Sequence, residues 1–261
     1  MRKSALLTIA AGAIAAFVQA APLARAADEP TVLITGSSRG IGFEITRVYA
    51  ERGWNVIATC RTPSEAEALQ ELAAEHDNIA IEELDVTDHI EIDALAQEYK
   101  STPIDILLNN AGISGGSENQ KFGELNYPTY NTVMDVNVLG PLKMAEAFVD
   151  HVAVSTQKKI INISSTQGSI TSNFGGQYFY RASKAALNMV MRTLAIELKD
   201  KGITVGILAP GFVRTDFTKG IDLPIMINPD ESAAAVVAVI DDYTFEDTGT
   251  FIKHTGEESP W

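Results

Sequence analysis

Residues with special chemistry are scarce in this sequence of 261 residues. The only cysteine is Cys60, which excludes an internal disulfide. None of the four histidines (His76, His89, His151 and His254) lies at metal-ligand spacing from another histidine or cysteine, so no metal site is predicted. The 20 lysines and arginines form no cluster and are outnumbered by 34 acidic residues. This argues against a nucleic-acid ligand, because binding phosphates requires clustered positive charge.

A run long enough to span a membrane is also missing. Residues 5–18 form an apolar segment of 14 residues, whereas a spanning helix needs about 20. A basic start (residues 1–3) precedes this segment, and the small-residue cleavage pattern Ala24-Arg25-Ala26 follows it. These features predict a secretory signal peptide over residues 1–26 and a mature chain, 27–261, without a stable membrane span. The expected location is exported, in the periplasm, or cytoplasmic if the signal is not used.

The rest of the chain alternates between short apolar runs rich in β-branched residues and longer helical patterns. Such alternation is typical of a parallel sheet with helices on both faces. The sequence therefore predicts an α/β fold, a Rossmann-type doubly wound parallel sheet in a single domain. The predicted strands cover residues 31–35, 54–59, 79–84, 104–109, 159–164, 203–208 and 249–252, and the predicted helices cover 40–52, 88–99, 130–151, 178–199 and 230–240, with another that opens at 62.

The helix that opens at residue 62 carries a start signal. Thr62 can cap the N-terminus, Pro63 suits the first helical position, and Glu65 can complete a capping box. We therefore expect a regular helix from this point.

The predicted helices 130–151 and 178–199 are apolar on nearly all sides. One face of each can pack on the sheet, and the other needs a cover. This pattern favours a subunit interface, and thus a homodimer or homotetramer, although a deep core position is the alternative. In the second helix the apolar residues are Ala185, Ala186, Leu187, Met189, Val190, Met191, Leu194, Ala195 and Ile196.

A glycine-rich turn joins the first strand to the first helix. Gly36, Gly40 and Gly42, with Ser38, Arg39 and Ile41 between them, let backbone N–H groups and a helix N-terminus approach a pyrophosphate.

The same turn also fits the nucleophile elbow of α/β-hydrolases, with Ser38 as nucleophile and His254 as base. The first reading is favoured, because an elbow belongs after a strand in the middle of the sheet. In addition, Gly42 has no role in an elbow.

The end of the second strand indicates which cofactor is preferred. An NAD site places an acidic residue here to bond the ribose 2′-hydroxyl, but the chain has Arg61 at this point and no acid before Glu65. Arg61, together with Arg39 in the glycine turn, suits a 2′-phosphate. NADP(H) is therefore expected in preference to NAD(H), although both arginines could simply be solvated.

Tyr180 and Lys184 are four residues apart on one predicted helix, so they share a helix face. A free tyrosine has a pKa of about 10, too high for efficient proton transfer near neutrality. A fixed lysine cation would stabilise the phenolate and lower that pKa. The alternative is that Tyr180 is a core aromatic residue.

Further polar motifs follow the predicted strands, where open α/β sheets bind ligands. Asp85 follows the third strand and Asn109-Asn110-Ala111-Gly112 ends the fourth. Asn137 lies in the long helix just before Gly140-Pro141. The pair Ser164-Ser165 ends the fifth strand, and Pro210-Gly211-Phe212-Val213-Arg214-Thr215 ends the sixth.

In this order, these motifs resemble the short-chain dehydrogenase/reductase family from residue 31 to about residue 252. The sequence ATCR at the end of the second strand and the pattern G-x-F…G-E-x-x-P-W from Gly249 to Trp261 are similar to the C-factor/sniffer-like carbonyl reductase branch. The resemblance implies that Tyr180 is the general acid, that Lys184 holds the nicotinamide ribose and lowers the tyrosine pKa, that Ser165 bonds the substrate oxygen, and that Asn137 orders a proton-relay water. It implies cofactor contacts from Gly36, Ser38, Arg39, Gly40, Ile41, Gly42, Arg61, Asp85, Val86, Asn109, Ala111, Gly112, Tyr180, Lys184, Pro210, Gly211, Val213 and Thr215.

The implied activity is NADPH-dependent reduction of an aldehyde or ketone to an alcohol. Residues 113–129, 166–177 and 217–229 are expected to shape the pocket for this small-molecule substrate. One alternative is an exported cofactor-binding signalling protein of the C-factor type with little turnover, which would fit export better, because nicotinamide cofactors are recycled in the cytoplasm. A purely structural module would leave the motif set unexplained.

Overall fold

The computed structural model describes residues 29–261, so the predicted signal peptide, residues 1–26, lies outside the described residues. The fold is one seven-stranded sheet in the order β3-β2-β1-β4-β5-β6-β7, in which every pair of neighbouring strands is parallel. The strands are β1 (Thr31–Thr35), β2 (Asn55–Cys60), β3 (Ile79–Glu83), β4 (Ile106–Asn109), β5 (Lys159–Ile163), β6 (Thr204–Ala209) and β7 (Phe251–Lys253). The predicted doubly wound sheet is confirmed.

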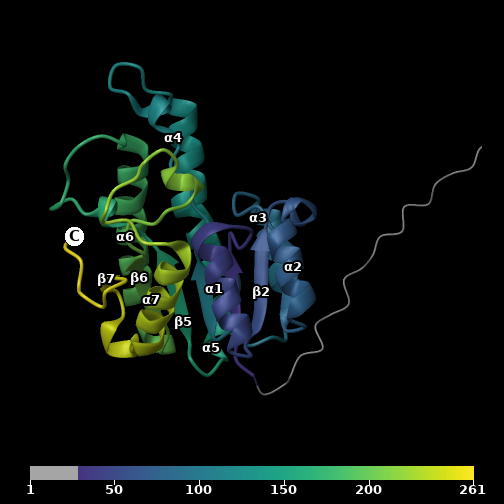
Figure 1. Cartoon of the computed structure of the whole chain (residues 1–261). Coiled ribbons are helices and arrows are strands. Elements are labelled where there is room, and N and C mark those ends of the chain that lie inside the picture. The colour runs from purple at the N-terminus through teal and green to yellow at the C-terminus, as the bar shows by residue number, and fades with distance from the viewer. Residues whose placement is uncertain (1–28) are drawn as a thin grey trace, which may run out of the picture.

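Helices cover both faces of the sheet (Figure 1). Helices α1 (Gly40–Glu51), α2 (Glu67–Glu75) and α7 (Pro229–Asp242) share one apolar cluster with the sheet. Helices α3 (His89–Glu98), α5 (Gly140–Ala153) and α6 (Tyr178–Glu197) share the other. Strands β1, β2, β4, β5 and β6 are buried along their full length, as expected for parallel strands covered on both sides. None of the helices within residues 29–261 is long and apolar enough to cross a membrane.

The predicted capping box at Thr62 is wrong. Residues Pro63–Glu65 form a separate 3₁₀ turn, and the Thr62 side chain caps nothing. Ala66 then departs from helical geometry, with φ −92° and ψ 58°, so α2 starts only at Glu67.

The long helix predicted over residues 130–151 is divided into three parts. It starts as α4 (Tyr127–Met134), widens into a π-helical turn at Asp135–Leu139, and continues as α5. Glycine is required at position 140, because a Cβ there would lie 2.9 Å from the carbonyl oxygen of Val86. The π turn therefore lies where the helix approaches the segment after β3, and it contains Asn137. Such turns occur often at functional sites.

Candidate active site

The loops that follow the carboxyl ends of the strands gather above the sheet in Figure 1. Most of the predicted cofactor residues lie in these loops, whereas Asn137, Tyr180 and Lys184 lie in helical turns. The direction of strand order reverses between β1 and β4. Ligands of open α/β sheets bind in the crevice at such a switch point.

Glycine gives the turn after β1 its tight form. Gly36 and Gly40 have φ angles of 73° and 60°, which other residues rarely adopt. A Cβ on Gly42 would lie 2.3 Å from the carbonyl oxygen of Gly36 and 2.3 Å from Nδ2 of Asn110. The turn consequently has no room for a side chain at position 42.

The N-terminus of α1 is suited to an anion. No side chain caps it, and its first turn contains no acidic residue. The free N–H groups and the helix dipole therefore favour negative charge there. Ser38 and Arg39 immediately precede the helix, and the Arg39 side chain is three-quarters exposed, with its Nε 3.9 Å from the Asp216 carboxylate. The turn thus fits the pyrophosphate of a dinucleotide.

Asn110, which sequence reasoning left without a role, joins the end of β4 to the glycine turn. Its Nδ2 donates to the carbonyl oxygens of Thr35, at 2.9 Å, and Gly36, at 3.1 Å. The Thr35 hydroxyl in turn accepts the backbone N–H groups of Asn110, at 3.0 Å, and Ala111, at 3.1 Å. The N-N-A-G pattern was the available signal, but it did not indicate which asparagine makes these contacts.

The side chain of Asn109 bonds to the neighbouring strand. It is buried and donates from Nδ2 to Oδ1 of Asn162 on the neighbouring strand, at 2.9 Å. Gly112, by contrast, borders two of the predicted catalytic residues: a Cβ there would lie 3.6 Å from Nζ of Lys184 and 3.3 Å from Oδ1 of Asn137.

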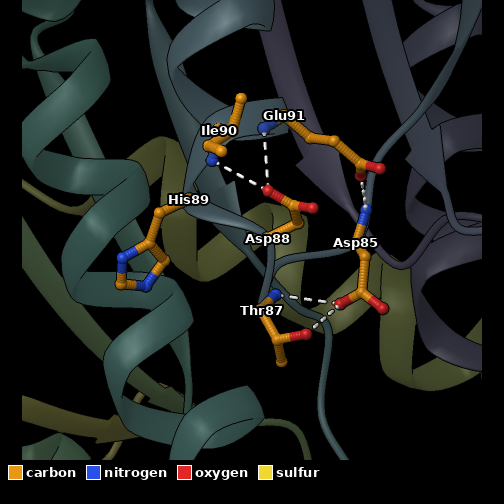
Figure 2. Close-up of a pocket in the computed structure, with 6 residues that line it drawn as sticks. All are labelled: Asp85, Thr87, Asp88, His89, Ile90 and Glu91. Carbon is orange, nitrogen blue, oxygen red and sulfur yellow. Dashed lines mark hydrogen bonds between the residues drawn. The ribbon is translucent and has the colours of Figure 1, made fainter.

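A surface depression of about 530 Å³ opens beside the end of β3 (Figure 2). Its lining residues are Asp85, Thr87, Asp88, His89, Ile90 and Glu91. Figure 2 shows the Asp85 carboxylate accepting the backbone N–H of Thr87, at 2.9 Å, and its hydroxyl, at 2.7 Å. The adjacent Val86 is buried.

Arg61, at the end of β2, is exposed and has no ion pair among residues 29–261, so its guanidinium is available to a phosphate.

Tyr180 lies in the first turn of α6 with only 8 % of its surface exposed. Burial raises the pKa of its phenol to about 12, although a hydrogen bond with the Ser165 side chain acts in the opposite direction. The ring of Phe217 packs edge-on against the Tyr180 ring at 5.1 Å between centroids. An aromatic residue from the predicted 217–229 loop therefore covers the phenol.

Of the two serines after β5, the structure brings Ser165 to Tyr180. Ser164 is buried, and its hydroxyl donates to Oδ1 of Asn188. The Ser165 hydroxyl also accepts the backbone N–H of Gln167, at 3.1 Å.

In the structure, burial and not Lys184 determines the direction of the Tyr180 pKa shift. The Lys184 ammonium donates to the carbonyl oxygen of Ile163, at 2.8 Å, and lies 5.8 Å from the centroid of the Tyr180 ring. Burial lowers the pKa of Lys184 itself to about 8. Both shifts have the same cause, because removing a group from water disfavours its charged form.

Asn137 lies in the π turn and is completely buried. Its Nδ2 donates to the carbonyl oxygen of Ile113, at 2.8 Å, and to the Ser183 hydroxyl, at 2.9 Å. Its Oδ1 accepts the backbone N–H of Ile113, at 2.9 Å. Both amide hydrogens are therefore used within the protein, so the side chain could hold a relay water only as an acceptor.

The loop Pro210–Thr215 reaches from β6 to the glycine turn. A Cβ on Gly40 would lie 3.4 Å from Cγ2 of Thr215. The Pro210 carbonyl accepts the Ser232 hydroxyl at 2.7 Å, and the Val213 carbonyl accepts the Thr218 hydroxyl at 2.7 Å. Gly211 has a φ of 94°. The loop is thus fixed above the site.

The hydrolase interpretation does not fit the topology. Its nucleophile, Ser38, follows β1, whereas His254 directly follows β7, four strand positions away. At about 4.8 Å per strand this places the two residues roughly 19 Å apart across the sheet, far beyond hydrogen-bond reach. The His254 ring lies instead beside Gly211, where a Cβ would be 3.0 Å from its Cε1.

The buried amine of Lys184 makes stability depend on pH. Its pKa is about 8 in the folded protein and 10.5 in an unfolded chain, so between these values the unfolded chain binds more protons. The free energy of unfolding should therefore rise with pH. Relative to Lys184→Met, we expect the wild type to gain about 2 kcal/mol between roughly pH 7 and pH 10, measured by urea unfolding. Parallel pH profiles for the two proteins would contradict this prediction.

Comparison with known proteins identifies the family. The family model for short chain dehydrogenases matches residues 30–224. The 1-hydroxy-2-glutathionyl-2-methyl-3-butene dehydrogenase of Rhodococcus sp. (strain AD45) is 34% identical over 88% of this chain and 99% of its own length. The C-signal protein of Myxococcus xanthus is 35% identical over 64% of this chain and 99% of its own. The crystal structure of NADPH-bound carbonyl reductase from chicken fatty liver has a TM-score of 0.83 at 32% identity, covering 89% of this chain and 99% of that chain. The protein therefore belongs to the short-chain dehydrogenase/reductase family of oxidoreductases.

Proposed function

We propose that the protein reduces the carbonyl group of a small aldehyde or ketone to an alcohol, with NADPH as cofactor. The observation that carries the proposal is the paired hydroxyls of Ser165 and Tyr180, with Lys184 on the same helix. They lie at the carboxyl ends of the strands, on the same side of the sheet as the anion site of the glycine turn. The structural similarity to an NADPH-bound carbonyl reductase supports the same reaction.

The side chains divide the chemistry between them. When bound, NADPH would supply a hydride to the carbonyl carbon. Tyr180 is the proton donor to the developing alkoxide, because its phenol is protonated near neutrality and lies beside the Ser165 hydroxyl. Ser165 donates a second hydrogen bond to that oxygen. Lys184, when charged, stabilises the phenolate that remains and holds the nicotinamide ribose. The side-chain oxygen of Asn137 would accept a hydrogen bond from a water, and this water would return a proton to Tyr180.

The remaining predicted contacts belong to the cofactor. The turn Gly36–Gly42 would hold the pyrophosphate, and Asp85 and Val86 the adenine. Residues from Asn109 to Gly112 would line the ribose region, and Val213 and Thr215 would orient the carboxamide. Arg61 and Arg39 would bind the 2′-phosphate.

Changing Arg61 to aspartate tests the cofactor preference. The variant loses a charge-assisted bond to the 2′-phosphate and gains an acid that can bond a 2′-hydroxyl. We expect the Kd for NADPH to rise about 10- to 100-fold and the Kd for NADH to fall, measured by fluorescence titration. Lys100→Asp, the same charge reversal at an exposed position, is the control. An unchanged ratio of the two Kd values would remove Arg61 from the cofactor site.

A second candidate function is a cofactor-binding signalling protein of the C-factor type. It is favoured by the similarity to C-signal, which this chain matches over 99% of that protein's length. Tight NADPH binding without turnover of any carbonyl compound would support it over the reductase.

Export of the mature chain, 27–261, and self-association are part of the proposal. Export rests on the signal-like residues 1–26, and cell fractionation that finds the protein in the cytoplasm would contradict it. A homodimer or homotetramer is supported by the outer face of α6, where Met189 is 66% and Ile196 is 72% exposed. A monomeric mass by light scattering would contradict the assembly.

A further inference from the structure

Gln120 is a buried polar residue that has no role in the proposed chemistry. It ends a short 3₁₀ turn in the loop after β4, and only 4% of its surface is exposed. Its Oε1 accepts the backbone N–H groups of Phe179, at 2.7 Å, and Tyr180, at 3.3 Å. Its Nε2 donates to the carbonyl oxygens of Ser114, at 2.7 Å, and Gly116, at 2.9 Å. One side chain thus joins two segments about 60 residues apart in the sequence.

The start of α6 needs this contact. Gln177, which precedes the helix, is left-handed at φ 48° and supplies no side-chain cap. The N–H of Arg181 makes a helical bond to the carbonyl oxygen of Gln177, so the three residues before Arg181 have no intrahelical acceptor. Gln120 accepts two of these N–H groups. Because they are buried, leaving them unpaired would be unfavourable.

The carbonyl group of Tyr180 is held from the same side of the site. It accepts the hydroxyl of Ser183 at 2.8 Å, and that hydroxyl accepts from Asn137, which is bonded to the backbone of Ile113. The N–H and the C=O of Tyr180 are therefore both linked to the segment 113–116, which follows β4.

We propose that Gln120 is a positioning residue for Tyr180. By joining the Tyr180 backbone to the segment 113–116, it fixes the phenol relative to Ser165 and to the site above β4. The catalytic consequence rests on the proposed function, but the contact itself can be measured independently of activity.

Amide exchange tests the contact. Gln120→Met keeps the side-chain length but removes the acceptor and the donor, whereas Gln120→Glu keeps an acceptor for Phe179 and Tyr180. We expect exchange at these two amides to become at least about fivefold faster in Gln120→Met and to stay slow in Gln120→Glu. Gln97→Met, on the exposed side of α3, is the control. If the methionine variant does not fold, Gln120→Asn, which is one methylene too short, provides the same comparison. Unchanged exchange in the uncapped variant overturns the proposal.

Kinetics test the positioning. We expect kcat to fall about tenfold or more in Gln120→Met, because small displacements of a catalytic group are costly, while KM for NADPH stays within about twofold. Gln120→Glu cannot donate to the carbonyl oxygens of Ser114 and Gly116, so it should keep the slow exchange without recovering kcat. Faster exchange with an unchanged kcat overturns the positioning role, since Gln120 would then only stabilise the helix end. A wild type without any turnover refutes the proposed function and with it the catalytic role, and the exchange rates then decide the contact alone.

Discussion

Tyr180→Phe is expected to lower turnover by about 10²–10⁴-fold, the usual contribution of a general acid, while leaving NADPH binding unchanged. The substitution removes one hydroxyl and keeps the ring that packs against Phe217. The lost bond to Ser165 is partly offset, because the cost of removing a hydroxyl from water is lost as well. We therefore expect the free energy of unfolding to change by no more than about 1 kcal/mol.

The matched control is Tyr178→Phe, two residues earlier on the same helix, where the ring is 46% exposed. It should turn over like the wild type. Activity is followed as carbonyl-dependent NADPH oxidation, and binding by fluorescence titration. Wild-type turnover in Tyr180→Phe would remove this residue from the reaction.

Gly42→Ala should have the second-largest effect, on both stability and cofactor binding. The new methyl group would lie 2.3 Å from the Gly36 carbonyl oxygen and 2.3 Å from Nδ2 of Asn110. Neither atom can move without breaking the bonds that Asn110 makes to Thr35 and Gly36. We expect a loss of about 1–3 kcal/mol in the free energy of unfolding, typical of overpacking. The displaced turn should weaken NADPH binding at least about tenfold, as for one lost bond to a charged group.

Gly53→Ala separates crowding from backbone conformation. Gly53 has a φ of 79°, but a Cβ there meets nothing within 4 Å. This variant should lose about 1 kcal/mol through its left-handed backbone alone and bind NADPH normally. Urea unfolding and NADPH titration of both variants provide the comparison. Normal binding in Gly42→Ala would show that the turn does not hold the cofactor.

Sequence reasoning was most successful where a local pattern determines the structure. The β-branched run before Gly36 predicted β1 with the bounds that the structure shows. The order of strand and helix patterns predicted the parallel sheet. The π turn around Asn137 was not predicted, because it accompanies the approach of Gly140 to Val86, which are far apart in the sequence. The strand at residues 104–109 was predicted two residues too long at its start, since apolar residues also occur in the loop that leads into it.

Prediction of the site was limited in the same way, because contacts between distant parts of the sequence leave no local pattern. Tyr180 and Lys184 were identified because their spacing lies within one helix, but the upward shift of the tyrosine pKa was not predicted. That direction depends on burial and on the position of the ammonium beside Ile163, neither of which helical spacing reveals. Gln120 was overlooked for a similar reason: a single glutamine in a loop carries no pattern, and its partners lie about 60 residues away.

Transfer of deuterium from NADPH labelled at the transferable position tests the central claim most directly. The wild-type protein is incubated with the labelled cofactor and a panel of aldehydes and ketones, and the products are examined by mass spectrometry. The proposed function predicts an alcohol with one deuterium on the former carbonyl carbon, and no such product from Tyr180→Phe. NADPH that binds tightly but transfers no label to any carbonyl would contradict the reductase and favour the signalling alternative.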